Sequence, residues 1–358
     1  KRLFVNINIL IDYLIISAMV SIAINYIARN IAKRNNILVD LPDRSRKFHK
    51  RPTPLTGGLS IFLSLLISAK LYIDLNELNS FIPLFSSTLV LGSFFIILVF
   101  LIDDINPIRP SLRLVTQALC SYLIINMTGV YLESFGDLLG FGEIQLGSFG
   151  IPITIFCVVG IMNAFNMIDG INGLCSGSAL VMLLFIGFAS GFIFDSMLVL
   201  LIGSMLGFLV FNLRIIGKQR AVFLGDHGSN FIGFVVAWIA IYCSQNSIYE
   251  IAPITAVWFV AIPLLDCIGL IISRTLRGVS WAAPGRDHIH HKLMLHYSPE
   301  MSLFIILTFT SILNVFALFL ENNFNTYVSF YAFMLFAISY YLVFYLFIRG
   351  RSYEAKDV

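Results

Sequence analysis

Long apolar stretches, separated by short polar segments, follow one another along almost the whole chain. A transmembrane helix needs about 20 predominantly apolar residues. The pattern therefore predicts an all-α polytopic membrane protein of about 11 transmembrane helices, in a single domain of residues 1–358. The expected spans are about 6–28, 54–73, 81–102, 111–128, 149–165, 174–193, 196–213, 229–245, 251–275, 302–320 and 327–348.

Basic residues lie almost entirely in one set of the segments between these spans. Of the 23 Lys and Arg residues, 20 fall on the side of the 29–53 loop, and only Lys1, Arg2 and Lys70 fall on the other. The positive-inside rule assigns the basic side to the cytoplasm. We therefore expect an uncleaved first span, an outside N-terminus and a cytoplasmic C-terminus. The predicted cytoplasmic loops are about 29–53, 103–110, 166–173, 214–228 and 276–301.

Composition agrees with a membrane protein. Hydrophobic residues make up 58% of the chain and charged residues 12%, with a mean hydropathy of +0.88, whereas soluble domains are roughly 45–50% apolar and 25% charged. The net charge is only +3, and no nucleic-acid partner is expected. The five cysteines lie within apolar runs without a metal-binding spacing, so we expect them to pack in the core.

Polar residues that neither a span nor a plain loop requires gather in five stretches on the predicted cytoplasmic side. These are "RSRKFHKRPTPLTGG" (44–58), "LIDDINPIR" (101–109), "NAFNMIDGINGL" (163–174), "VFLGDHGS" (222–229) and "PGRDHIHHKLM" (284–294). The topology brings all five to one membrane surface.

Two adjacent acids, Asp103 and Asp104, directly follow an apolar run. The C-terminus of a helix carries a partial negative charge, which disfavours acids there. An ordinary solvated turn is one interpretation of this pair. The other is a functional pair, because ionisable groups at membrane depth are usually functional.

The stretch at 163–174 repeats polar groups every three residues, at Asn163, Asn166, Asp169 and Asn172. On a helix these residues would lie near one face. No basic residue is near, so these oxygens and amides suit Mg²⁺ or a polar base and sugar better than phosphate. Hydrogen bonding between helices of the bundle is the alternative.

The stretch at 222–229 combines a flexible turn with an acid. Gly225 permits close backbone approach, Phe223 offers a ring that can stack on a base, and Ser229 is expected to cap the next helix. The N-terminus of a helix attracts phosphate, but Asp226 repels it unless a cation lies between them. The stretch therefore predicts either a phosphate bridged by Mg²⁺ or Asp226 as a simple helix cap.

The stretch at 284–294 has three His in four residues, at His288, His290 and His291. Zinc is one interpretation, but the i, i+4 His pair of HExxH sites is missing. A basic loop that holds phosphate or sugar is favoured. The basic run 44–51, with Lys50, is a topology signal, an anionic-lipid contact or a phosphate grip.

Carboxylates, amides, glycine-rich turns and basic loops together favour Mg²⁺-dependent phosphoryl transfer, and no P-loop or kinase signature is present. The motifs resemble those of the polyprenyl-phosphate N-acetylhexosamine-1-phosphate transferases, most closely the bacterial enzymes that use undecaprenyl phosphate and N-acetylglucosamine (GlcNAc). The resemblance is carried in order by "RKFH" with "PLTGG", "DD", "NAFNMIDGINGL", "VFLGDHGS", "IPLLD" (262–266) and "HIHH".

This resemblance implies transfer of GlcNAc-1-phosphate from UDP-GlcNAc to undecaprenyl phosphate with release of UMP, the first membrane step of cell-surface polysaccharide synthesis. It implies a multi-pass protein of the bacterial inner membrane with a cytoplasmic active site, Mg²⁺ (with Mn²⁺ as a substitute), contact with membrane lipid, and leaves a homodimer open. Carried over by motif, the catalytic residues are Asp103, Asp104 and His288, and the metal ligands are Asp226 and Asn166. The substrate-binding residues are Lys50, Asp169, Asn172, Phe223, Gly225, Arg274, Arg286, His290 and His291.

Three departures from the family pattern bear on sugar specificity. Asn172 stands where many bacterial relatives have Asp, His227 stands where a small residue is common, and "PGRDHIHH" replaces a "PDRQHIHH"-like run. Another UDP-N-acetylhexosamine or UDP-MurNAc-pentapeptide is the alternative donor.

A membrane transporter is the alternative of a different class, and it would place ionisable residues in the middle of several spans. Here the mid-span acids are chiefly Asp12 and Asp266. Asp266 lies eight residues before Arg274, about 12 Å along a helix, so it reaches the predicted site only if its helix bends. A non-catalytic lipid-binding scaffold would explain the basic loops but not the Asn, Asp and Gly motifs.

Overall fold

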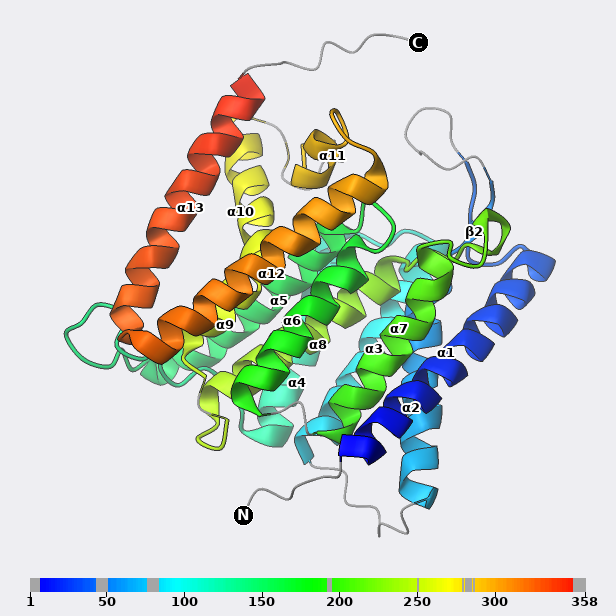
Figure 1. Cartoon of the computed structure of the whole chain (residues 1–358), viewed down its shortest axis with the longest axis horizontal. Coiled ribbons are helices and arrows are strands. Elements are labelled where there is room, and N and C mark those ends of the chain that lie inside the picture. Colours follow the sequence, from blue (N-terminus) through cyan, green and yellow to red (C-terminus); the bar gives the residue numbers. More distant parts are fainter. Residues whose placement is uncertain are drawn as a thin grey trace.

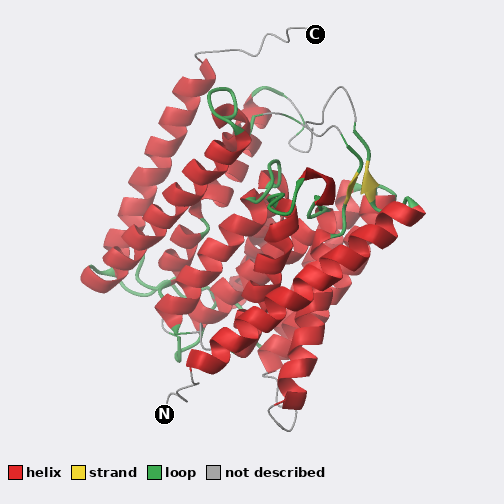
Figure 2. Cartoon of the chain, turned by 45° about the vertical axis from the view of Figure 1, so that its right-hand side comes forward, coloured by secondary structure: helices red, strands yellow, loops and turns green. Residues whose placement is uncertain are grey.

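The computed structural model describes residues 7–42, 51–75, 84–191, 195–249, 251–278, 280, 285 and 287–349. Helices dominate this part of the chain, and Figure 2 shows them side by side, with two short strands at one end. The helices are α1 (Ile7–Asn35), α2 (Gly57–Leu75), α3 (Leu84–Ile105), α4 (Pro110–Thr128), α5 (Gly150–Ile168), α6 (Leu174–Ser190), α7 (Ser196–Asn212), α8 (Asp226–Gln245), α9 (Pro253–Phe259), α10 (Ala261–Leu276), α11 (Ile289–Leu293), α12 (Pro299–Asn323) and α13 (Thr326–Arg349).

The predicted all-α polytopic architecture is confirmed, whereas the number of spans stays a prediction. Each of the eleven predicted ranges overlaps a helix, and the ninth overlaps both α9 and α10. Seven of the described helices are long and apolar enough to cross a membrane, or eight if the bent pair α9–α10 forms one span, and α6 and α7 are shorter apolar helices. In Figure 1, α1 begins and α13 ends at opposite faces of the bundle.

Helix α8 forms the centre of the bundle and packs against α2, α3, α5, α6 and α9. It is apolar on all sides, as expected of a helix with no solvent-facing stripe, and Phe231, Phe234 and Trp238 are completely buried in it. The outer helices α1, α12 and α13 instead expose many large apolar side chains. These helices therefore present the surface suited to lipid.

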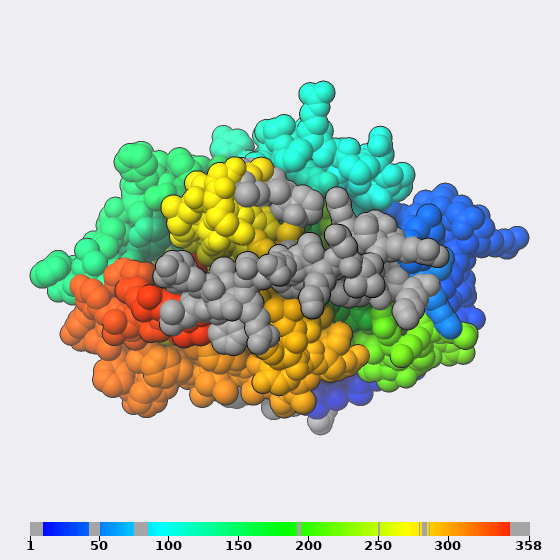
Figure 3. All heavy atoms as spheres, turned by 90° about the horizontal axis from the view of Figure 1, so that it is seen from above, coloured from blue at the N-terminus to red at the C-terminus, as the bar shows by residue number. Residues whose placement is uncertain are grey.

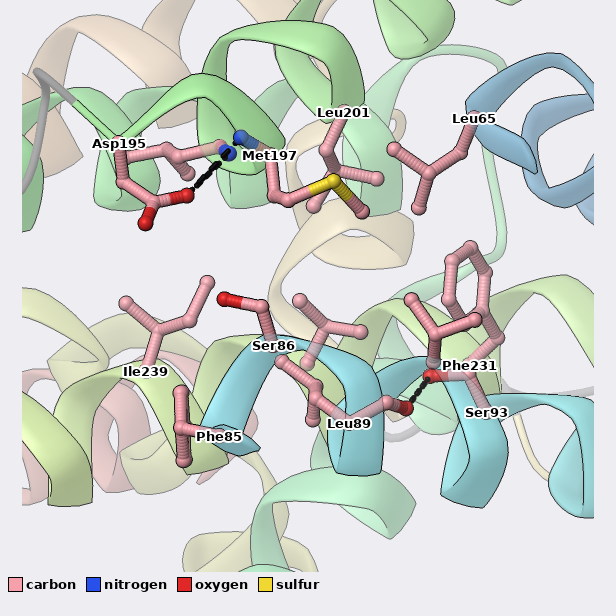
Figure 4. A pocket seen from close by; sticks show the side chains of 13 residues that line it. Leu65, Phe85, Ser86, Leu89, Ser93, Asp195, Met197, Leu201, Phe231 and Ile239 are labelled. Carbon is pink, nitrogen blue, oxygen red and sulfur yellow. Dashed lines mark hydrogen bonds between the residues drawn. The ribbon is translucent and has the colours of Figure 1, made fainter. Parts of the chain in front are cut away.

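A small cavity lies between α2, α3, α7 and α8 (Figure 4). Its volume is about 40 Å³, and apolar side chains such as Leu65, Leu201 and Phe231 make up most of its lining. At its edge, Asp195 caps α7 by accepting hydrogen bonds from Met197 N at 2.9 Å and Leu198 N at 3.3 Å. A space of this size holds about one water molecule, so it is a gap in packing rather than a substrate site.

Two features direct side chains toward one face of the bundle. Helices α9 and α10 meet at an angle of 78° around Val260. The hairpin of β1 (Val39–Asp40) and β2 (Thr53–Pro54) leads into Leu55, which pairs with Phe223 just before α8. Seen from above in Figure 3, the end of α10 (yellow) and the α11–α12 region (orange) share this face.

Candidate active site

The start of α8 is held by a carboxylate from another helix. Asp104 Oδ1 accepts a hydrogen bond from Asp226 N at 3.0 Å, and its Oδ2 accepts one from His227 N at 3.3 Å. The residue before them, Gly225, has φ +80°, a left-handed conformation that glycine adopts without strain. Asp104 thus supplies the cap that α8 lacks locally, and α8 begins at Asp226.

The expectation that Ser229 caps this helix is therefore wrong. Ser229 lies inside the first turn, where its Oγ donates to Asp226 O at 3.2 Å. The alternative that Asp226 is a simple cap is not what the structure shows either, because the N-cap residue is Gly225 and no local side chain caps α8. The free N–H groups are instead satisfied by Asp104, which comes from the end of α3.

His227 belongs to the same arrangement. Its side chain is completely buried, and its Nδ1 lies 2.5 Å from Asp104 Oδ2. One carboxylate therefore contacts two backbone N–H groups and one imidazole. His227, which the family resemblance does not require, is therefore a direct partner of Asp104, a predicted catalytic residue.

Asp103 has a different environment from its neighbour. Its side chain has no exposed surface, and its Oδ1 lies 2.9 Å from Arg113 Nη2 and accepts from Ile108 N at 2.8 Å. The second terminal nitrogen of the same guanidinium, Nη1, lies 3.5 Å from Asp226 Oδ2 at the start of α8. Arg113 therefore bridges two of the predicted site carboxylates.

Asp226 is the most open of these three carboxylates, with 44% of its side chain exposed. The predicted partner Asn166 is beside it, with Nδ2 donating to Asp226 Oδ1 at 3.2 Å and to Ser229 Oγ at 2.9 Å. Behind them a chain of amides runs from Asn163 through Gln117 to Asn230, which donates to Asp226 O at 2.9 Å. Asn163 and Asn166 thus both link helices, as the hydrogen-bonding interpretation of the 163–174 motif expects. The metal or nucleotide role of this motif stays a prediction.

The turn after α5 joins the carboxylates to the histidine loop. Asp169 ends α5 and is open to solvent, but protein atoms around it and the charges of Asp226 and Asp104 raise its pKa to about 7. The next residue, Gly170, packs directly on the imidazole of His290, because an added Cβ would lie 2.0 Å from His290 Nε2. Asp169 is therefore placed between the two groups of predicted site residues.

His288 is fixed by a buried acid. His288 Nδ1 lies 2.7 Å from Asp266 Oδ2, and Asp266 Oδ1 accepts from Ile289 N at 2.9 Å. Asp266 has no exposed surface. The 78° bend lies at Val260, before both Asp266 and Arg274, so α10 is continuous between these two residues. Asp266 joins the site because His288 reaches it, and no bend between Asp266 and Arg274 is needed.

The three histidines form one cluster. The ring centroids of His288 and His290 are 5.4 Å apart, and those of His290 and His291 are 4.1 Å apart. His290 is completely buried, and neither of its ring nitrogens has a hydrogen-bond partner among the described residues. Burial, with the neighbouring His291 and His288, lowers the pKa of His290 far below its usual value, so its imidazole is neutral.

Basic side chains flank this cluster. Arg274 is buried at the end of α10, with Nε 3.9 Å from Asp287 Oδ2, and Arg277 Nη2 lies 2.8 Å from the same oxygen. Burial works to raise the pKa of Asp287, but the hydrogen bond and charge of Arg277 outweigh it, so the pKa is lowered. Burial also lowers the pKa of Lys292 to about 8.

Of the remaining predicted residues, some lie at the site and two lie outside the described part of the chain. Gly225 and Phe223 lie at the site, where Phe223 is half-buried and its carbonyl accepts from Gly57 N at 2.9 Å. Asn172 is half-buried in the turn that follows Asp169. Lys50 and Arg286 lie outside the described residues.

The donor set can be compared with what a metal requires. Within the described ranges, no three His, Cys, Asp or Glu side chains are placed to share one metal ion. Magnesium does not require such a cage, because it keeps several waters and binds through one or two carboxylates plus substrate phosphates. The exposed carboxylate of Asp226 fits Mg²⁺ bound in this way. The Asn166 amide lies beside it, and Asp169 is near enough for the charge of Asp226 to raise its pKa.

Contributors that were not predicted as site residues include Arg113, His227 and the link from Asp266 to His288. Arg113 lies in a stretch that resembles an ordinary basic loop end. The sequence contains one indication of its role. Arg113 lies in the first turn of α4, on the side of the predicted topology that is rich in Lys and Arg, and close to the "DD" motif.

Comparison with known proteins identifies the family. The model of glycosyl transferase family 4 matches residues 86–244, a range that includes Asp103, Asn166 and Asp226. A protein of Escherichia coli O157:H7 named undecaprenyl-phosphate alpha-N-acetylglucosaminyl 1-phosphate transferase is 34% identical over 294 residues, which cover 80% of this chain and 77% of that protein. Proteins of the same name from Yersinia pestis and Haemophilus influenzae are also 34% identical, over 82% and 76% of this chain and 79% and 76% of their own lengths. The chain therefore belongs to glycosyl transferase family 4, and its resemblance to the polyprenyl-phosphate N-acetylhexosamine-1-phosphate transferases is confirmed.

Proposed function

We propose that this protein transfers GlcNAc-1-phosphate from UDP-GlcNAc to undecaprenyl phosphate and releases UMP. The observation that carries the proposal is the meeting of two groups of residues at the end of α5. On one side lies the carboxylate and amide group around Asp226, and on the other the histidine loop, with Asp169 and Gly170 between them. Relatives named for this reaction cover about four fifths of the chain.

The chemistry needs positioning and charge neutralisation more than a strong base. A phosphate monoester has a second pKa near about 6, so at neutral pH the lipid phosphate is mostly a dianion already. Its oxygen attacks the β-phosphorus of the UDP-sugar, and a new P–O bond forms. The bond from the β-phosphorus to the oxygen that bridges to the α-phosphorus breaks, and UMP leaves with that electron pair.

We propose Mg²⁺ as the cofactor, held by Asp226 and Asn166, with Mn²⁺ as a substitute. When bound, the metal offsets the repulsion between the phosphate groups of donor and acceptor. Asp226 suits this position because its carboxylate is partly open to solvent, and Asp169 adds a second charge nearby.

The two members of the "DD" motif have separate tasks in this proposal. Asp104 fixes the start of α8, so that the backbone around Gly225 keeps one conformation next to the donor. Asp103 fixes Arg113, whose guanidinium reaches toward Asp226 and the phosphates bound there.

The histidine loop holds the sugar and pyrophosphate. Asp266 accepts a hydrogen bond from the protonated Nδ1 of His288, so that Nε2 is the nitrogen left to meet substrate. Arg274 and Lys292 add positive charge at the same end of the site. On the uridine side, Phe223, Gly225 and the turn with Asp169 and Asn172 provide an aromatic face, a close backbone approach and polar contacts.

We place the protein in the bacterial inner membrane with this site on the cytoplasmic face, where the basic loops lie. Synthesis of a lipid-linked sugar there is the first membrane step of a cell-surface polysaccharide. The departures at Asn172, His227 and Asp287 leave another UDP-N-acetylhexosamine as the second candidate donor. The mid-span acid Asp266 gives no support to a transporter, because it is bonded to His288 at the site.

The test is UMP release by the purified protein with Mg²⁺, undecaprenyl phosphate and a panel of UDP-sugars. We expect release with UDP-GlcNAc that EDTA abolishes, and loss of at least about 100-fold in Asp226→Asn, because charge stabilisation of this kind contributes about 10²–10³ in rate. The matched control is Asp137→Asn, in the loop between α4 and α5, which should keep full activity. No release with any donor would refute the enzyme.

A second measurement separates the direct route from a two-step route in which an Asp attacks first. In the direct route, exchange of labelled UMP into UDP-GlcNAc requires the lipid. Robust exchange by lipid-free protein would establish a phospho-sugar enzyme and exclude direct attack.

A further inference from the structure

A second pocket with a strong positive charge lies beside α1. It has a volume of about 480 Å³ and is bounded by the end of α1, the β1–β2 hairpin and the short 3-10 turn Lys218–Arg220. The described lining residues include four cations and no carboxylate: Arg29, Lys33, Asn36, Val39, Arg51, Pro52, Thr53, Lys218, Gln219 and Ala221. None of the residues placed at the candidate active site is among them.

Two of these cations are forced close together. Arg29 Nη2 donates to Gln219 O at 2.5 Å, and Lys33 Nζ donates to the same oxygen at 3.4 Å. The two charged groups are therefore at most about 6 Å apart, a distance at which like charges repel appreciably unless water or an anion screens them. Arg29 and Lys33 donate hydrogen bonds to neutral oxygens of Gln219 and Asn30. Arg29 Nε is buried and has no hydrogen-bond partner among the described residues.

The position of the pocket indicates where a compensating anion comes from. Helix α1 is an outer helix, with only 22% of its candidate span buried. In the turns below Arg29 and Lys33, on the same side of the helix, it exposes Met19, Ile22 and Tyr26. An acyl chain lying along this surface would bring its headgroup to the level of the two cations. Basic clusters at the cytoplasmic end of a span bind anionic lipids through this geometry.

We propose that this pocket is a phosphate-binding site, separate from the candidate active site, that holds the headgroup phosphate of an anionic membrane lipid. Arg29 and Lys33 bind the phosphate from α1, and Lys218 binds it from the 3-10 turn. The wall of the pocket continues into the active site, because Phe223 N donates to Pro54 O at 2.8 Å two residues after Ala221. A bound lipid therefore steadies the segment that carries Phe223 and Gly225.

Native mass spectrometry of the full chain, purified in detergent, tests the proposal with phosphatidylglycerol and with phosphatidylcholine of the same acyl chains. We expect the wild-type protein to retain phosphatidylglycerol selectively. Lys33→Glu should weaken that binding by about 20- to 30-fold, since one charge near the surface contributes about 1 kcal/mol and charge reversal counts nearly twice. Arg34→Glu is the matched control, because Arg34 is the next residue of the same helix turn but does not line the pocket.

Several outcomes would overturn the proposal. Equal weakening by Arg34→Glu would mean diffuse surface charge rather than a site. Displacement of the lipid by inorganic phosphate at millimolar concentration would assign the pocket to a soluble anion. A raised KM for undecaprenyl phosphate in Lys33→Glu would make it part of the acceptor site. Lys218→Glu, an exposed position outside the helices, repeats the test if Lys33→Glu lowers the Tm.

Discussion

At the residue scale, the four acids near the start of α8 differ in what holds them. Asp103 is locked by Arg113, and Asp104 is locked by backbone N–H groups and His227. Asp226 and Asp169 remain open to solvent. Two neighbouring residues of one motif therefore organise the site, while acids from two other segments are left to meet metal and substrate.

The bond between Asp266 and His288 gives a residue-scale prediction. Asp266→Asn keeps the shape but presents an NH₂ group to His288 Nδ1, which then must accept, so the proton moves to Nε2. We expect kcat to fall by roughly 10- to 100-fold, as for other residues that orient a functional histidine, with a smaller change in KM and an altered pH profile. Steady-state kinetics of UMP release across pH would measure it.

Asp12→Asn is the control for this substitution, because Asp12 is the other mid-span acid and lies exposed on α1. It should behave as wild type. A purely structural role for Asp266 would lower the Tm and the amount of active protein while leaving the shape of the pH profile unchanged, and that result would contradict the prediction.

Asp169 gives a prediction about pH. Its pKa is raised from 3.8 to about 7 in the folded protein, so its contribution to stability is fully present below the unfolded pKa and is lost as pH rises through the folded pKa. Asp169→Asn removes this loss. In metal-free protein we expect the Tm advantage of the variant to grow between about pH 4 and 7 and then to level off. A Tm difference that does not change with pH would show that Asp169 has an ordinary pKa.

The sequence predicts many of these residues but not their partners. The acids and amides stand in short motifs, so residue type and spacing single out Asp104, Asn166, Asp169 and Asp226 as candidates, and the family resemblance supplies their predicted roles. The contact between Asp104 and His227 joins positions 123 residues apart, and the bridge made by Arg113 depends on how α3, α4 and α8 pack. Such contacts follow from the tertiary arrangement, which no local pattern contains.

At the element scale, close approach of helices sets the frame around the site. Helices α1 and α7 make the most extensive contact in the described bundle. Ser17 Oγ donates to Leu200 O at 2.5 Å, and Ser21 Oγ donates to Ser204 O at 2.6 Å, with small residues between them. Small residues at this spacing allow helix backbones to approach closely in a membrane.

Gly207 is the position on which this contact most depends. A Cβ there would lie 2.5 Å from Ala18 O and from Ser21 Cβ. We expect Gly207→Ala to lower the free energy of unfolding by about 1–3 kcal/mol through overpacking, measured as thermal unfolding in detergent. Gly160→Ala, on α5 with nothing within 4 Å of the added Cβ, is the matched control and should be neutral or stabilising. Equal effects of the two substitutions would contradict close packing of α1 on α7.

Element boundaries show where sequence patterns stop being sufficient. Hydrophobic length predicted one continuous helix over 251–275, but the chain breaks at Val260 and turns by 78°. Proline explains the start of each part, since Pro253 is the first residue of α9 and Pro263 lies in the first turn of α10. Periodicity alone does not distinguish a proline that starts a new helix from one that a continuous helix tolerates.

At the scale of the whole molecule, the proposed function requires that one face of the bundle is cytoplasmic. The helix α11, which carries two of the histidines, and the strand β2, which borders the basic pocket, lie toward the end of the bundle where α1 and α13 end (Figure 1). The chain just before α8 lies beside β2, because Phe223 N donates to Pro54 O at 2.8 Å. The loop between α4 and α5 lies toward the opposite end. The distribution of Lys and Arg predicts that the first end faces the cytoplasm.

Cysteine labelling in whole cells tests this orientation. In a background without the five native cysteines, Glu143→Cys, exposed in the α4–α5 loop, should react with a membrane-impermeant maleimide in intact cells. Lys218→Cys should react only after the membrane is permeabilised. The reverse pattern would place the candidate site outside the cell, where UDP-sugars are absent.

The central claim is that the sugar moves together with its phosphate. UDP-GlcNAc labelled with ³²P at the β-phosphorus distinguishes this reaction from ordinary glycosyl transfer, with purified protein, Mg²⁺ and undecaprenyl phosphate as the other components. The account predicts that the label enters the lipid fraction in equal amount to the unlabelled UMP released. Label that stays in water as UDP, with an unlabelled sugar on the lipid, would contradict it.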